Sequence, residues 1–246
     1  MRTDLFMIPG PVKEKDLADK TLVMIDVLRA STTICYALNS GARAVIPVEE
    51  PGEATDMRTK IGPENSLLGG ERDGVKIENF NLGNSPLEYT PEKVADKTII
   101  LTTSNGTRGY VRGAHSRLII TAGLVNISRV AGRVAREGRN LAVLCAGDVG
   151  HFSIEDTLCG GMLIHKLLTE ENIDMKLNDA ASLALLLYRS NSRSLKETIA
   201  QGEHGRFLRE IGFGDDVALA AESDSIPVLP VYKDSRIVLE EKMSIE

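Results

Sequence analysis

Residues 23–33 read Val-Met-Ile-Asp-Val-Leu-Arg-Ala-Ser-Thr-Thr, which joins an apolar strand to a helix through a polar loop. The apolar run before Asp26 is typical of a buried strand. Ser31 and Thr32 favour the start of a helix, because their hydroxyls accept hydrogen bonds from free backbone N–H groups. The stretch therefore predicts an α/β unit with polar side chains just beyond the carboxyl end of its strand.

Two later stretches have the same layout. Residues 99–109 read Ile-Ile-Leu-Thr-Thr-Ser-Asn-Gly-Thr-Arg-Gly, and residues 143–148 read Val-Leu-Cys-Ala-Gly-Asp before a helix that begins near Ser153. In open α/β sheets, ligands bind beyond the carboxyl ends of the strands, where loops and helix N-termini converge. We therefore expect the three loops to form one anionic-ligand site with groups suited to Mg²⁺ and phosphate.

Strands alternate with helices through the first two thirds of the chain, which predicts βαβ units and a largely parallel sheet. Residues 228–239 hold two strand patterns around a short turn, and a hairpin there would add antiparallel pairing. No linker rich in proline, glycine or serine divides the sequence. We predict a single α/β domain over residues 1–246, with a layered α/β/α arrangement and a largely parallel or mixed sheet.

Charge and cysteine content narrow the functional class. The formal net charge is −6 and no basic run is present, which argues against nucleic acid as the main partner. Cys35, Cys145 and Cys159 are an odd number without metal-site spacing, as in a reduced intracellular protein. The sequence has neither the apolar region of a signal peptide nor a run long enough to span a membrane. We expect a cytoplasmic protein without a membrane partner, and the sequence leaves open whether it forms a homo-oligomer.

The first loop has two interpretations. Asp26, fixed at a strand end, is suited to be a Mg²⁺ ligand, and Arg29 is suited to contact a phosphate or carboxylate. Alternatively, the two residues form a buried ion pair. Ser31 and Thr32 are suited to bind an anion at the helix N-terminus, although Ser31 would also serve as an ordinary N-cap.

The other loops offer similar groups. The second contains Asn105, Gly106, Thr107 and Arg108, of which Thr107 is suited to hydrogen-bond an oxyanion. In the third, Ser153 and Asp156 form a capping-box pattern that does not require Glu155, so Glu155 is free to bind Mg²⁺ or to favour the helix dipole. Glu71 and Arg72 place one metal-type and one anion-type group after a glycine pair.

Several familiar catalytic patterns are absent. The sequence has no dinucleotide-binding glycine motif, no P-loop, no zinc-protease motif and no nucleophile elbow. A haloacid-dehalogenase-type phosphatase would need a second aspartate two residues after Asp26, where this chain has Leu28. The four histidines show no zinc-site spacing.

Taken together, the motifs resemble the 2-phosphosulfolactate phosphatase (ComB-type) family. They occur in family order from about residue 20 to 165, at residues 25–33, 70–72, 83–86, 103–108 and 145–147, with Glu155-Asp156 following. The resemblance implies an α/β fold distinct from the haloacid dehalogenases. It also implies a Mg²⁺-dependent phosphatase that hydrolyses 2-phospho-3-sulfolactate to 3-sulfolactate and phosphate, a step toward coenzyme M. The family pattern has an aspartate where this chain has Asn81, so we assign Asn81 no charge-dependent role.

This hypothesis gives each candidate residue a role. The Mg²⁺ ligands would be Asp26, Glu71 and Glu155. Arg29 and Arg108 would complete the catalytic set with these three carboxylates. The residues predicted to bind the substrate or its phosphate are Ser31, Thr32, Arg72, Asn84, Ser85, Asn105, Gly106 and Thr107. The expected nucleophile is a metal-bound water, and a phosphorylated Asp26 is the alternative.

Two other functions remain open. The chain could be a phosphatase for another phosphorylated hydroxy acid, because members of the family also occur outside methanogens. It could also be a non-catalytic module that binds a phosphorylated or sulfonated metabolite in the same crevice. In each case the expected partner is a small anionic molecule.

Overall fold

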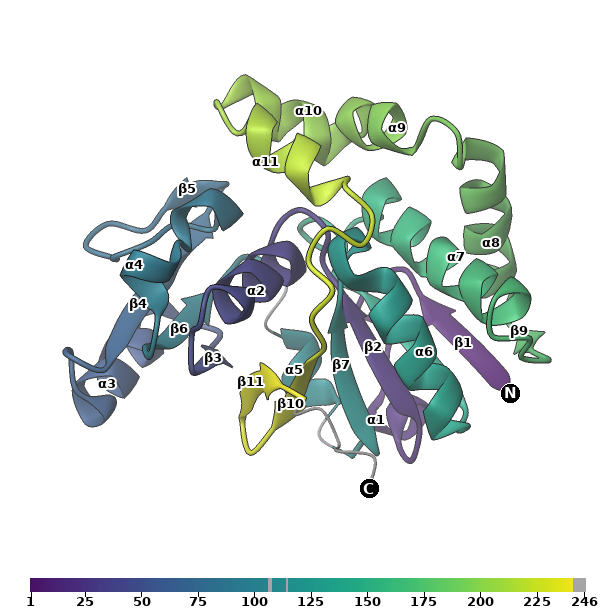
Figure 1. The fold of residues 1–246 in the computed structure, drawn as a ribbon, viewed down its shortest axis with the longest axis horizontal. Coiled ribbons are helices and arrows are strands. Elements are labelled where there is room, and N and C mark those ends of the chain that lie inside the picture. Colours follow the sequence, from purple (N-terminus) through teal and green to yellow (C-terminus); the bar gives the residue numbers. More distant parts are fainter. Residues whose placement is uncertain (106–107, 114, 241–246) are drawn as a thin grey trace.

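The strands assemble into one mixed sheet with helices packed on its faces (Figure 1). The computed structural model describes residues 1–105, 108–113 and 115–240, and at Arg108 and Val111 it describes the backbone only. Within these residues the sheet has eleven strands. This arrangement confirms the predicted layered α/β/α fold with a mixed, mostly parallel sheet.

The strands, in chain order, are β1 (Arg2–Phe6), β2 (Thr21–Ile25), β3 (Ala44–Pro47), β4 (Ser66–Arg72), β5 (Val75–Lys76), β6 (Thr98–Thr102), β7 (Leu118–Ala122), β8 (Leu141–Cys145), β9 (Lys176–Leu177), β10 (Pro230–Lys233) and β11 (Arg236–Leu239). The α-helices are α1 (Glu14–Leu17), α2 (Ala30–Asn39), α3 (Pro51–Ile61), α4 (Pro91–Val94), α5 (Arg108–Arg112), α6 (Ile127–Glu137), α7 (Ile154–Thr169), α8 (Asp179–Asn191), α9 (Leu195–Gln201), α10 (Glu203–Glu210) and α11 (Gly214–Ala220). Short 3₁₀ helices cover Pro86–Glu88 and Leu124–Asn126.

The sheet consists of two parallel groups joined by a hairpin. The strand order is β5-β4-β6-β3-β11-β10-β7-β2-β8-β1-β9, with parallel pairing from β4 to β3 and from β7 to β9. The β10–β11 hairpin pairs antiparallel with β7 on one side and with β3 on the other. Its turn residues Asp234 and Ser235 both have positive φ, 50° and 59°, as in a type I′ hairpin turn. The predicted hairpin is therefore confirmed.

The hairpin also reverses the strand direction between the two groups. Three successive antiparallel pairings separate β3 from β7, so these strands run in opposite senses through the ladder. In a flat sheet, their carboxyl ends would point to opposite edges. Adjacent strands in a sheet are rotated by about 20–25° relative to one another, however. Over the three pairings between β3 and β7, this twist inclines the two groups by roughly 60–75°. Loops that follow strands of both groups line one cavity.

Both faces of the central strands are buried. In β2, Val23 and Ile25 belong to the core that α6 and α7 cover, whereas Leu22 and Met24 belong to the core that contains apolar residues of α2. A strand covered on both sides requires apolar residues at every position, which explains its uninterrupted hydrophobic run. The loop after β2 is thereby fixed between two packed layers.

Strand β1 is the main element that the sequence analysis does not predict. Its burial pattern is that of an inner strand, although it contains Thr3 and Asp4. Asp4 is buried because Lys20 donates a hydrogen bond to its carboxylate at 2.8 Å. These polar residues at inward positions hide the strand pattern, and the buried Asp4 is explained only by its partner Lys20, which immediately precedes β2.

Helix α10 also begins earlier than the sequence predicts. The apolar pattern indicates a helix from Gly205, whereas the structure begins it at Glu203. This difference places His204 in the first turn of the helix rather than in a loop.

The close packing of α7 against α8 gives a test of the fold. A Cβ on Gly161 would lie 2.0 Å from the Ala184 carbonyl oxygen, which is backbone and cannot turn away. We expect Gly161→Ala to lower the free energy of unfolding by ~1–3 kcal/mol in urea titrations. Gly132→Ala in α6 is the matched control, since its nearest atom is a Glu171 carboxylate oxygen 3.5 Å away. The control should gain up to ~1 kcal/mol from helix propensity, and equal effects of both substitutions would contradict the packing.

Candidate active site

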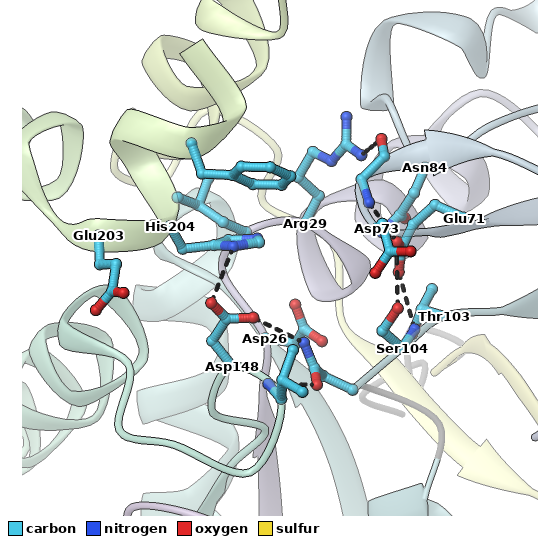
Figure 2. A pocket seen from close by; sticks show the side chains of 15 residues that line it. Asp26, Arg29, Glu71, Asp73, Asn84, Thr103, Ser104, Asp148, Glu203 and His204 are labelled. Atoms are coloured by element: carbon cyan, nitrogen blue, oxygen red, sulfur yellow. Dashed lines mark hydrogen bonds and ion pairs between the residues drawn. The ribbon is translucent and has the colours of Figure 1, made fainter. Parts of the chain in front are cut away.

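A cavity of about 290 Å³ lies where the polar loops converge (Figure 2). Each of the three loops singled out in the sequence contributes to its wall: Asp26 follows β2, Asn105 follows β6 and Asp148 follows β8. Helix α10 closes the cavity from the side of the C-terminal third with Glu203, His204 and Phe207. The cavity therefore combines segments that are far apart in the sequence.

Asp26 is held in place by the start of α2. The Ala30 N–H donates to its Oδ1 at 3.1 Å, and its own N–H donates to Ser31 Oγ at 3.0 Å. The side chain is almost completely buried, with 8% of the residue exposed. Burial raises the pKa of Asp26 to about 7, and the charges of Glu71 and Glu155 add to this effect, while the Ala30 N–H and His204 oppose it.

Glu71 connects two loops of the other parallel group. Its Oε1 accepts the Ser104 N–H at 2.8 Å, and its Oε2 accepts the Gly74 N–H at 2.8 Å and the Ser104 hydroxyl at 3.3 Å. These bonds orient the carboxylate in the wall that contains Asp26. The structure therefore brings two of the three predicted metal ligands to one cavity.

Glu155 lies in a neighbouring cavity of about 460 Å³, whose wall also contains Asp148, Glu203 and His204. Burial raises the pKa of Glu155, which is 2% exposed. Its negative charge contributes to the raised pKa of Asp26, so the two carboxylates influence one another without lining the same cavity. Within residues 1–105, 108–113 and 115–240, no three acidic, histidine or cysteine side chains are arranged to hold a metal ion.

Asp156 joins the first loop to the third. Ser153 Oγ accepts its N–H at 3.2 Å, as the capping pattern predicts. Its carboxylate instead reaches beyond the helix and accepts the N–H groups of Val27 and Gly147 at 2.8 and 3.1 Å. Burial raises its pKa well above the usual range, and nearby Asp26 and Glu155 act in the same direction. Asp156 thus fixes the spacing of the two strand ends.

Arg29 is paired, but with a residue other than Asp26. Its guanidinium donates to Asp216 Oδ2 at 2.8 Å and to the Gly74 carbonyl at 2.7 Å, and it lies 4.2 Å from the centre of the Phe213 ring. Only 3% of Arg29 is exposed. The alternative of a buried Asp26–Arg29 ion pair is therefore wrong: Arg29 is in a buried ion pair, but its acidic partner comes from α11.

The predicted binding residues are divided among different environments. Asn84 and Asn105 line the cavity, and Asn84 Oδ1 is buried with no hydrogen-bond partner in the described part of the chain. Thr32 and Ser85 are committed to internal bonds, Thr32 to the Val27 carbonyl and Ser85 to Asp216. Arg72 bonds to the carbonyls of Glu71 and Glu49 and to Thr102, away from the cavity wall. Gly106, Thr107 and the Arg108 side chain lie outside the described residues.

The structure adds residues that the motifs do not identify. His204 Nδ1 lies 3.3 Å from Asp148 Oδ2, and both residues line the cavity. Asp73 and Glu203 bring further carboxylates to the same wall. Asp148 ends a quoted motif and was accessible to sequence reasoning, whereas His204 lies in a segment without any motif.

The cavity is acidic. Its described wall contains the five carboxylates of Asp26, Glu71, Asp73, Asp148 and Glu203, and its basic residues are Arg29 and His204. Because Arg29 is already paired with Asp216, the local charge is strongly negative. Such a site favours a cation, or an anion accompanied by a cation.

The polar crevice at the strand ends places this protein among the α/β proteins that bind small ligands beyond the carboxyl ends of their strands. The family described as 2-phosphosulpholactate phosphatase matches residues 6–235. The chain therefore belongs to this family of phosphoric monoester hydrolases, which confirms the resemblance seen in the motifs.

Relatives that carry the name probable 2-phosphosulfolactate phosphatase match over nearly the whole chain. The protein of Clostridium beijerinckii is 34% identical over 98% of this chain and 100% of its own length. The protein of Caldanaerobacter subterraneus subsp. tengcongensis is 38% identical over 91% of this chain and 92% of its own. The protein of Symbiobacterium thermophilum is 37% identical, covering 92% and 96%.

A helix must be about 20 residues long and mostly apolar to cross a bilayer. Across the described ranges of the chain, no helix is both long and apolar enough to cross a membrane.

The buried Arg29–Asp216 pair leads to a stability prediction. Asp216→Ala removes the carboxylate and leaves the Arg29 charge buried without its partner, so the free energy of unfolding should fall by ~3–5 kcal/mol. Asp215→Ala, an exposed neighbour in the same helical turn, should change it by less than ~1 kcal/mol. Chemical denaturation of the two variants measures the difference, and similar losses would contradict the role assigned to Asp216.

The raised pKa of Asp26 leads to a pH-dependent prediction. Because this pKa is about 7 in the folded protein against 3.8 ordinarily, ionising Asp26 opposes folding as the pH rises from 4 to 7. Asp26→Asn removes this cost. The stability gained by the variant should be near zero at pH 4 and grow to at most ~4 kcal/mol at pH 8. Unfolding should be measured in a chelating buffer, and a pH-independent difference would refute the assignment.

Proposed function

We propose that the chain hydrolyses 2-phospho-3-sulfolactate to 3-sulfolactate and phosphate, with Mg²⁺ as cofactor, as a step toward coenzyme M. The names of its relatives support the substrate. The chemistry of the cavity supports the need for a cation. The proposal also places the reaction in the cytoplasm, with this small anion rather than nucleic acid as the partner, consistent with the formal net charge of −6.

The proposal rests mainly on one observation: the substrate and the wall of the cavity both carry negative charge. The substrate has a phosphate, a carboxylate and a sulfonate, all negative, whereas the described wall has five carboxylates and a paired arginine. Direct binding of a polyanion to such a wall is unfavourable. A divalent cation between them removes the repulsion and converts the carboxylates into ligands.

Asp26 and Glu71 would hold the cation. They line the same cavity, and each is oriented by backbone N–H groups that leave further lone pairs on its carboxylate. Asn84 Oδ1 fits this interpretation, because a buried acceptor without a partner is suited to a water or ligand proton in the cavity. When bound, Mg²⁺ would neutralise the phosphoryl oxygens and orient the reacting groups.

The protein would contribute the enclosure and the fixed polar groups. Leu28, Val149 and Phe207 form apolar parts of the wall, which lower the local dielectric and strengthen the electrostatic contacts of a bound substrate. Glu155 would add to the negative potential from the neighbouring cavity rather than contact the substrate. We propose direct attack of water on phosphorus, which inverts its configuration. Retention of configuration would instead indicate a phosphorylated Asp26.

Phosphate release tests this function. The purified chain should release phosphate from 2-phospho-3-sulfolactate with Mg²⁺ and lose this activity in a chelator. Asp26→Asn should lower kcat by several orders of magnitude, because it removes one charged ligand, while circular dichroism stays unchanged. Asp215→Asn, exposed on α11, is the control and should retain full turnover.

The same assay separates the alternatives. A faster reaction with another phosphorylated hydroxy acid in a substrate panel would reassign the substrate. Tight binding of 2-phospho-3-sulfolactate without phosphate release from any phosphate ester would indicate a binding module instead of an enzyme.

A further inference from the structure

His204 lies at the boundary between the two cavities. It lines both, and its Nδ1 lies 3.3 Å from Asp148 Oδ2. Its ring stacks on Phe207, with centroids 5.9 Å apart and an angle of 30° between planes. Figure 2 shows the imidazole projecting from α10 toward Asp148, with Asp26 in the same part of the cavity. The ring is thus fixed by a carboxylate, an aromatic ring and its own helix.

Asp148 is itself positioned by the second loop. Its Oδ1 accepts a hydrogen bond from Asn105 Nδ2 at 3.4 Å, and Asn105 Oδ1 accepts the Val149 N–H at 2.9 Å. The carboxylate therefore has one oxygen toward Asn105 and the other toward the imidazole. A carboxylate at Nδ1 keeps a proton on that nitrogen and stabilises the doubly protonated ring.

This arrangement leaves Nε2 as the nitrogen available for chemistry. Since Nδ1 faces Asp148, Nε2 is the remaining proton-carrying atom of the ring, and no hydrogen bond to it occurs among the described residues. The side chain is 16% exposed and lines both cavities, so part of the ring is accessible from them. A histidine oriented by a carboxylate at one nitrogen and open at the other has the geometry of a general acid.

His204 shares its two cavities with several carboxylates and with two basic residues, Arg29 and His151. Asp148 faces it from the loop after β8, Asp26 from the end of β2, Glu155 from α7 and Glu203 from its own helix. All four carry negative charge when ionised. Burial raises the pKa of Asp26 and of Glu155, and the charge of His204 acts against that rise in both.

We propose that His204, oriented by Asp148, is the general acid that protonates the leaving oxygen in phosphate-ester hydrolysis. This role rests on the proposed function. As water forms the new P–O bond and the ester P–O bond breaks, the ester oxygen takes the Nε2 proton and leaves as an alcohol. The products are the hydroxy acid and dihydrogen phosphate, and neutral His204 then regains a proton from solvent.

The need for a general acid depends on the leaving group, which gives a specific test. An alkoxide such as that of 3-sulfolactate is a poor leaving group without a proton, whereas 4-nitrophenolate leaves readily as the anion. His204→Asn should therefore lower kcat/KM for 2-phospho-3-sulfolactate by ~10²–10⁴-fold. The loss of kcat/KM for 4-nitrophenyl phosphate should stay below ~10-fold, because its leaving group needs little protonation by a general acid.

The pH profile and two further variants complete the test. With 2-phospho-3-sulfolactate, the wild-type rate should fall on the alkaline side as His204 loses its proton, and His204→Asn should lack this fall. Asp148→Asn should show the same dependence on the leaving group with a smaller loss, as expected of a positioning residue. His115→Asn, at an exposed histidine that pairs with Glu14, should leave both reactions unchanged.

Three outcomes would overturn the proposal. One is an equal loss of activity toward both esters in a folded His204→Asn variant, which would indicate a structural role. Another is a rate with 2-phospho-3-sulfolactate that still falls on the alkaline side in the His204→Asn variant. This second outcome can be measured even if the wild type does not hydrolyse 4-nitrophenyl phosphate. The third is a wild type that hydrolyses neither ester with Mg²⁺, which would refute the proposed function as well.

Discussion

The buried ion pair between Arg29 and Asp216 is the interaction on which the site depends. Arg29 is the N-cap residue of α2, Asp216 lies in α11, and the same network reaches the Gly74 carbonyl and the Ser85 hydroxyl. Four segments from the length of the chain are therefore joined through this one ion pair. An ion pair buried this completely is stable only if each charge keeps its partner. This requirement keeps α10 and α11 over the strand ends, and with them His204.

The cavity concentrates negative charge that solvent would otherwise screen. Asp26 and Glu155 are buried with raised pKa values. The carboxylate of Asp156, beside them, accepts hydrogen bonds from the N–H groups of Val27 and Gly147. Such crowding opposes folding and is typical of functional sites rather than of structural cores. In our proposal a divalent cation relieves it, and the imidazole of His204 adds a proton where the ester bond breaks.

Sequence patterns succeeded where local rules determine structure. The buried strand β2 is an unbroken apolar run because both of its faces are covered. The family follows from motifs whose residues are consecutive. The same reasoning did not predict β1, because the buried Asp4, which pairs with Lys20, interrupts the apolar pattern expected of an inner strand.

By itself, the sequence determined the alternation of strands and helices, the hairpin near the C-terminus and the family, since each depends on residues that are neighbours in the chain. Only the tertiary structure decided which side chains share a cavity. The antiparallel hairpin between β3 and β7 reverses one half of the sheet, yet Asp26 and Glu71 from the two halves line one cavity, while Arg72 bonds away from it. Likewise, no local pattern around His204 indicates that Asp148, far earlier in the chain, will lie against its ring, because that contact depends on how α10 packs.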